Sequence, residues 1–166
     1  MRSDIRKLLE SVDENVRHDT VVMLAKPVEG VSRLNAVAAL IDAMKDPGWR
    51  VRKASVDTLL GHYESSEFLA GLEGLLFEEG DAGARNSAIE AFIRLGHEAS
   101  SHLISAVETD NVDVRKFIVD IAGEVRDKDT VAMLIKALKD EDENVVASAV
   151  EHLGTMKEPS VRSALV

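Results

Sequence analysis

The chain has 166 residues, of which 45% are hydrophobic and 30% are charged, as in an ordinary globular domain. It contains no cysteine, which excludes disulfides, thiol nucleophiles and thiolate metal sites. The net charge of −10 at pH 7 repels nucleic-acid phosphates and anionic lipid, and no stretch is apolar enough for a signal peptide or a membrane span. We therefore expect a cytoplasmic protein with neither a nucleic-acid nor a membrane partner.

In chain order, a short helix around Ile5 to Leu9 is predicted first, as a leading half repeat over residues 3–11. A pattern of two helices then recurs about every thirty residues, over approximately 13–46, 48–78, 81–109, 111–140 and 142–166. One leucine column marks the second helices at steps of 32, 31, 31 and 31 residues: Leu40, Leu72, Leu103, Leu134 and Leu165. A second column marks the first helices: Val16, Val51, Ala84, Val114 and Val145.

The cleanest copy runs over residues 111–140. In its first half Val114, Ile118 and Ala122 recur at helical spacing, and in its second half Val131, Leu134 and Leu138 do the same. The corresponding apolar stripes of other copies include Ile104 and Val150. Three residues before each member of the valine column stands a helix-capping residue type: Asp13, Gly48, Asp81, Asn111 and Asp142.

These columns predict one all-α domain over residues 1–166. Its expected architecture is a right-handed α-solenoid of about five antiparallel helix pairs. Terminal repeats of a complete solenoid usually have a polar outer face, and neither end shows one clearly. We therefore expect a segment of a longer array.

Three stretches of the sequence indicate a family: Val51-Arg52-Lys53-Ala54, Val114-Arg115 and the segment from Leu134 to Asp140. They resemble the short HEAT-like repeats first described in phycobilin lyases. The resemblance covers nearly the whole chain and implies the HEAT fold. For function it implies several classes: bilin lyases, the metal-dependent hydroxylase of deoxyhypusine, and proteins that only bind other proteins.

The hydroxylase relatives carry histidine-glutamate pairs directly after the valine-arginine position of several repeats. Here only His18-Asp19 resembles such a pair, because the other repeats carry Lys53-Ala54, Asn86-Ser87, Lys116-Phe117 and Ala147-Ser148 at that position. One pair cannot build a two-metal site. We therefore predict no metal, no cofactor and no catalytic residues.

An arginine follows the valine column in four repeats: Arg17, Arg52, Arg85 and Arg115. These side chains could form an anion-binding stripe or a structural ladder. Because acids such as Asp46, Asp110 and Asp140 end the preceding second helices, the ladder is favoured, with each arginine held by a carboxylate or by helix C-terminal carbonyls.

The second helices of stacked pairs usually line the concave face and present a preformed binding surface. The residues predicted to bind a partner there are Phe77, Asp42, Lys45, Ser105, Glu108, Lys136 and Lys139, with Trp49 added from an inter-repeat turn. Phe77 is a large apolar side chain in a column of charged residues, which is typical of an interface anchor or of a side chain that covers a joint between repeats.

The predicted function is a non-catalytic scaffold that binds another protein or peptide, as a monomer or weak oligomer. The alternative is an enzyme or enzyme subunit of the bilin-lyase kind, which clamps a chromophore and its carrier protein.

Overall fold

The computed structural model describes residues 3–156 as helices and turns, and no strand occurs in that range. The α-helices are α1 (Ser3–Leu9), α2 (Glu14–Met23), α3 (Arg33–Ala43), α4 (Trp49–His62), α5 (Leu69–Leu76), α6 (Ala82–Leu95), α7 (Ser100–Ala106), α8 (Val112–Val125), α9 (Lys128–Ala137) and α10 (Glu143–Gly154). Two short 3₁₀ helices, η1 (Ser65–Glu67) and η2 (Gly96–Ala99), lie between them. The predicted last second helix, with Leu165, lies outside the described residues.

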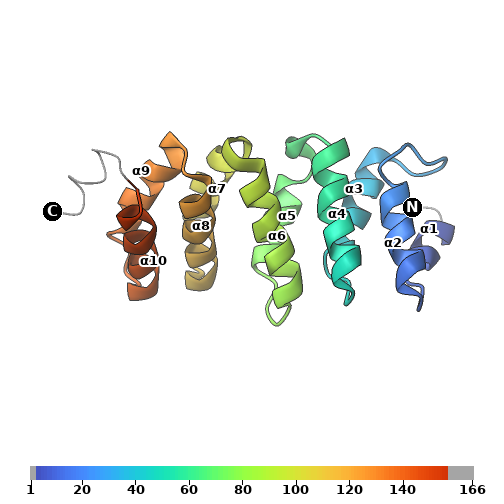
Figure 1. Ribbon diagram of the computed structural model, residues 1–166, viewed down its shortest axis with the longest axis horizontal. Coiled ribbons are helices and arrows are strands. Elements are labelled where there is room, and N and C mark those ends of the chain that lie inside the picture. The colour runs from blue at the N-terminus through green and yellow to red at the C-terminus, as the bar shows by residue number, and fades with distance from the viewer. Residues whose placement is uncertain (1–2, 157–166) are drawn as a thin grey trace. The chain divides into compact units, whose positions relative to one another are not determined.

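The helices alternate between first helices (α2, α4, α6, α8 and α10) and second helices (α3, α5, α7 and α9), as expected for an all-α solenoid. The chain divides into two compact units, Met1–Ala91 and Phe92–Val166. Within the first unit α2 packs beside α4, and α3 packs against α4 (Figure 1). Within the second unit α8 packs beside α10, and α9 contacts both (Figure 1). The assignment of residues 1–166 to a single domain stays a prediction.

All five predicted capping residues lie directly before a first helix. The side chains of Asp13, Asn111 and Asp142 accept hydrogen bonds from amides of the first helical turn, and Asp81 accepts one from Ala84. Gly48 caps α4 through its backbone alone. Each first helix therefore begins where the backbone amides of its first turn, which have no partner within the helix, can bind a capping side chain or solvent.

The core of each unit is small and mostly aliphatic. In the first unit the fully buried side chains include Leu24, Leu40, Leu59 and Leu72, and in the second they include Ile118, Ile121 and Leu134. Leu40, Leu72 and Leu134 belong to the leucine column, and the register read from the sequence therefore matches the packing.

Two residues predicted to belong to the apolar stripes are exposed instead. Ile104 of α7 is 37% exposed and Val150 of α10 is 45% exposed. Helical periodicity assigns a residue to a face of its helix, but burial also needs a neighbour that covers that face. No side chain in the described part of the chain buries either residue.

Candidate partner-binding surface

The predicted arginine ladder lies at the turns between repeats. These turns have one length, since residues 44–48, 77–81, 107–111 and 138–142 separate each second helix from the next first helix. Each ladder arginine donates from Nη1 to a backbone carbonyl of the turn before its own helix: Arg17 to Ser11, Arg52 to Asp46, Arg85 to Glu78 and Arg115 to Thr109. The four side chains therefore share one geometry.

Two of these arginines also reach the turn after the following second helix. Arg17 binds the carboxylate of Asp46 through Nε and Nη2, at 2.7 and 3.0 Å. Arg115 binds Asp140 in the same way, at 3.0 and 3.1 Å. The sequence placed the carboxylate partners in the preceding turn, whereas the two recorded bidentate pairs use the following one. Each of these two arginines thus joins two successive inter-repeat turns.

The aspartates of these pairs also shape their own turns. Asp46 accepts the amide of Gly48 at 2.7 Å, and Asp140 accepts the amide of Asp142 at 2.9 Å. Burial alone would raise the pKa of Asp140, but the hydrogen bonds from Arg115 outweigh it and hold that pKa below its ordinary value. These contacts of Arg17 and Arg115 favour the structural ladder over a free anion-binding stripe, and the shared structural role of all four arginines stays a prediction.

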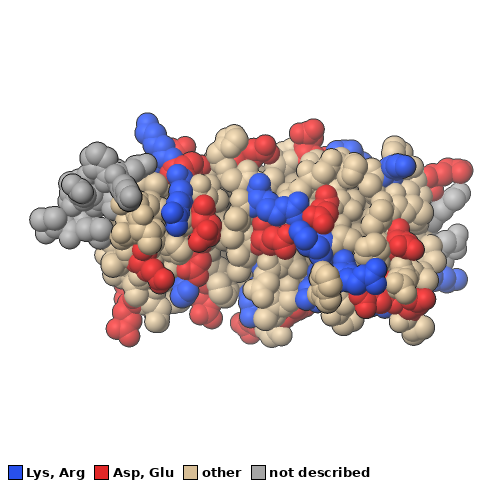
Figure 2. Space-filling view, in the orientation of Figure 1, with Lys and Arg blue, Asp and Glu red and all other residues tan. Residues whose placement is uncertain are grey.

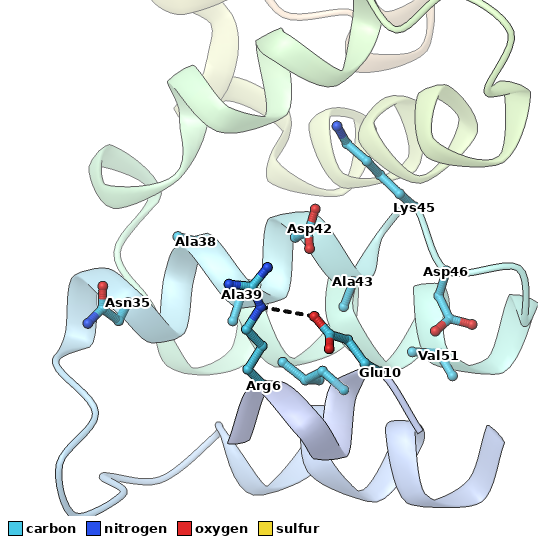
Figure 3. Close-up of a pocket in the computed structure, with 11 residues that line it drawn as sticks. Arg6, Glu10, Asn35, Ala38, Ala39, Asp42, Ala43, Lys45, Asp46 and Val51 are labelled. Atoms are coloured by element: carbon cyan, nitrogen blue, oxygen red, sulfur yellow. Dashed lines mark hydrogen bonds and ion pairs between the residues drawn. The ribbon is translucent and has the colours of Figure 1, made fainter. Parts of the chain in front are cut away.

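One second helix of the first unit, α3, forms a wall of an open groove. Its floor consists of small side chains, chiefly Ala38, Ala39 and Ala43 of α3. Figure 3 shows Arg6 of α1 and Glu10, which directly follows that helix, opposite these alanines, where their side chains form an ion pair at 2.9 Å. Asp42 of α3 and Lys45 of the turn after it line the same groove, and Lys45 also pairs with Glu78. The groove therefore has an alanine floor and a charged rim.

A comparable groove lies in the second unit, beside α9 and the inter-repeat turns 107–111 and 138–142. Val107 and Met133 supply apolar lining, while Glu108, Lys136 and Lys139 stand at its edge. Lys136 forms an ion pair with Glu108, and both side chains remain well exposed. Such exposed pairs contribute little to stability and exchange readily for contacts with a partner.

The residues predicted to bind a partner from the second helices are all exposed: Asp42, Lys45, Phe77, Ser105, Glu108, Lys136 and Lys139. Only Asp42, Ser105 and Lys136 lie within these helices, and the other four lie in the turns that follow them. Phe77 ends α5 as its C-cap and is 39% exposed, so most of its ring is already covered. Trp49 differs from the rest, because it is the first residue of α4 and lines a separate groove between α2 and α4. Participation of these residues in partner binding stays a prediction.

The described residues hold neither a candidate metal cluster nor a candidate membrane-spanning helix. No cluster of three or more histidine, aspartate or glutamate side chains there could hold a metal ion. His18 contacts Asp19 at 3.1 Å, and this pair has no third ligand from that set. None of the helices described is both long and apolar enough to span a membrane.

Comparison with known families agrees with this architecture. The sequence profile described as HEAT repeats matches residues 3–93 and 100–166, which is nearly the whole chain. The chain is a HEAT-repeat protein. The match is to HEAT repeats in general and does not assign the phycobilin-lyase type.

One curated HEAT-repeat relative is a HEAT repeat-containing taxis protein of Halobacterium salinarum, 28% identical over 167 aligned positions. The alignment covers 98% of this chain and 37% of the relative, so the chain spans little more than a third of the relative's length. Among solved structures, an engineered protein matches with 16% identity and a TM-score of 0.40, covering 99% of this chain and 94% of the other.

Proposed function

We propose that this HEAT-repeat chain is a non-catalytic scaffold that binds another protein through its second helices. The observation that carries the proposal is a pair of open grooves, one along α1 and α3 and one beside α9 and the inter-repeat turns 107–111 and 138–142. Both grooves have an apolar floor and an exposed charged rim, the arrangement found in protein interfaces. HEAT repeats commonly serve as interaction scaffolds, which supports the same conclusion.

The partner proposed is a protein of a taxis signalling system. This step rests on the similarity to the Halobacterium salinarum relative, whose name describes it as a taxis protein. A cytoplasmic location and a monomeric or weakly associating state belong to the same proposal. The grooves are already formed by helices, so a partner would bind with little ordering cost on this side.

Site-specific photo-crosslinking in the native cell tests the proposal. A photoreactive residue replaces Asp42 on α3 or Lys136 on α9, and a matched control replaces Glu151, an exposed residue of the first helix α10. We expect one partner adduct from the two second-helix positions and none from the control. Adducts of equal yield from all three positions, or none from Asp42 and Lys136, would exclude a second-helix interface.

The bilin-lyase alternative remains a separate hypothesis, and no contact in the described residues favours it. It is tested by mixing the purified chain with a linear tetrapyrrole and an apo carrier protein. Covalent attachment of the pigment to the carrier, seen as a stable visible absorbance after denaturation, would replace the scaffold proposal.

A further inference from the structure

The first helices carry a column of acidic residues that is exposed on α4 and α10 and half-buried on α6 and α8. Six residues after the valine column stand Asp57 on α4, Glu90 on α6, Asp120 on α8 and Glu151 on α10. Acidic and basic groups lie among each other on the face drawn in Figure 2. This acidic column is independent of the leucine and valine columns that build the core.

Lysines on the same helices pair with this column. Lys53 contacts Asp57 at 3.2 Å and Glu90 at 2.6 Å, and Lys116 contacts Asp120 at 2.8 Å. These ion pairs place charge on the surface where another protein would have to dock. A polar surface of this kind favours solvent over an apolar partner.

The first repeat breaks the column. Its corresponding residue is Val22 of α2, which is 47% exposed. Across the groove from α2 stands Trp49 of α4, which is 67% exposed. The groove between these helices is also lined by Ala25 and Ala54 and has a volume of about 420 Å³, within the roughly 300–1,000 Å³ range of binding pockets. The first repeat thus has an apolar groove where the other repeats carry a carboxylate.

The groove also holds a cation that no carboxylate neutralises. Of its two cations, Lys53 is already paired with Asp57 and Glu90, which leaves Arg50. Arg50 donates to the neutral amide oxygen of Asn15 at 3.1 Å, and no carboxylate among the described residues pairs with it. An exposed guanidinium beside a tryptophan favours a ligand that combines a carboxylate with an apolar group.

We infer that the groove between α2 and α4 docks a segment of a partner protein in which an aliphatic side chain stands next to a carboxylate. An apolar side chain of that segment lies between Val22 and Trp49, and a neighbouring carboxylate binds Arg50. This site uses the first helices and is distinct from the second-helix surface proposed above. The two surfaces can therefore hold two different segments, of one partner or of two.

The tryptophan of this groove reports directly on its occupancy, because the chain has a single tryptophan. The probe is a synthetic peptide of alternating leucine and glutamate pairs, titrated into the intact chain. We expect a saturable blue shift of Trp49 emission with a dissociation constant below about 1 mM. A peptide with lysine in place of glutamate, and one with serine in place of leucine, should bind at least tenfold more weakly, on the order of 1.4 kcal/mol.

Paired variants distinguish binding in the groove from nonspecific binding of the peptide elsewhere on the surface. Val22→Glu introduces the acid found in the other repeats and should weaken binding at least about tenfold. Val150→Glu is the matched control, because Val150 is a valine on first helix α10 with 45% exposure, and it should leave binding unchanged. Arg50→Gln removes the cation alone and should weaken binding of the glutamate peptide by about fivefold.

Several outcomes would overturn the inference. They are an unshifted Trp49 emission at millimolar peptide, equal binding of the lysine peptide, and equal losses for Val22→Glu and Val150→Glu. Binding of a labelled peptide without any change at Trp49 would place the site elsewhere and also reject it. None of these results bears on crosslinking from Asp42 or Lys136, so the second-helix proposal is judged separately.

Discussion

The carboxylate of Asp140 connects two parts of its repeat. It accepts both arms of the Arg115 guanidinium and the amide of Asp142 in the same turn. Arg115 is itself buried, and its pKa is raised chiefly by the hydrogen bonds to Asp140. A bidentate pair in a shielded position is worth more than an exposed ion pair, because removing either partner leaves a polar group without its bonds.

Asp140→Asn should make the protein less stable at neutral pH and less sensitive to acid. The folded pKa of Asp140 lies below its unfolded value of about 3.9. Its stabilisation is therefore present above that unfolded pKa and lost as the pH falls through the folded pKa. We expect the variant to lose about 1–3 kcal/mol at pH 7 and to show a smaller further loss between pH 5 and pH 2, in the approximate range set by charged hydrogen bonds.

Denaturant melts across that pH range measure both effects. Glu124→Gln is the control for removal of one negative charge, because Glu124 is an exposed residue of α8. A steeper acid dependence in Asp140→Asn than in the unmodified protein would contradict the assignment.

Phe77→Ala should separate packing from binding. The ring is 39% exposed, so its truncation should cost about 1–2 kcal/mol of stability, against roughly 3–5 for a fully buried phenylalanine. If Phe77 anchors the second-helix interface, partner binding should also weaken by about 1–2 kcal/mol.

Melting and partner titration give the two values for Phe77→Ala. Val150→Ala serves as the control, because it truncates an exposed apolar residue on a first helix. Full affinity in a destabilised Phe77→Ala variant would assign the ring to packing alone.

At the scale of elements, α8 and α10 are joined by a polar cluster. Asp120 of α8 accepts hydrogen bonds from Lys116 and from Ser148 of α10, and lies 3.4 Å from Nε2 of His152. Burial alone would raise the pKa of Asp120, and these hydrogen bonds reverse the direction so that the pKa is lowered. The His152 ring lies against Gly123 of α8, where a β-carbon would come within 2.1 Å of it.

Gly123→Ala should therefore destabilise the protein although alanine favours helices. The new methyl group must displace the His152 ring and weaken its contact with Asp120, at a cost of about 1–3 kcal/mol. Gly74→Ala in α5 is the matched control, because nothing lies within 4 Å of its β-carbon position. That change should stabilise the protein by about 0.5–1 kcal/mol. Thermal melts with equal shifts for both variants would argue against close packing at Gly123.

The element boundaries were predictable because each repeat carries the same local signals. Asp13, Asn111 and Asp142 are helix-capping residue types that mark where first helices begin, and the leucine column marks the buried face of the second helices. The environment of Trp49 was not predicted, because the sequence placed it in a turn, whereas it begins α4 and faces α2. The acidic column was readable from the same register, and the exception at Val22 is the signal that would have found the groove.

The arginine partners show a second limit of sequence reasoning. A repeated Val-Arg motif indicates that Arg17 and Arg115 have a shared role, but aspartates stand both in the turn before each arginine and in the turn after the following second helix. Only the fold decides which carboxylate is within reach. The exposure of Ile104 and Val150 has the same origin, since neighbouring helices determine burial.

At the scale of the whole molecule, charge is unbalanced. The chain has 30 acidic and 20 basic residues, which gives its net charge of −10. The excess acidic side chains repel one another in the folded state, and dissolved salt screens that repulsion. The shielded Arg17–Asp46 and Arg115–Asp140 pairs are screened less than exposed charges.

The melting temperature should therefore rise between about 10 mM and 500 mM sodium chloride, a range over which the Debye length falls from roughly 30 Å to below 8 Å. Calorimetry or circular dichroism at constant pH measures it, with sucrose as a neutral co-solute for comparison. A melting temperature that falls with salt would mean that exposed ion pairs such as Lys136–Glu108 dominate.

The equal length of the inter-repeat turns has a consequence for how such arrays diversify. Arg17 and Arg115 each span from one turn to the next, so a residue added at 44–48 or 138–142 would pull the aspartate out of register. The loops that join the two helices within a pair have no such constraint. They differ in length, from the long loop of residues 24–32 to the two-residue loop 126–127. Insertions and deletions between homologues should therefore occur mainly in the loops within helix pairs. The turns between repeats, which hold the arginines, should keep a constant length.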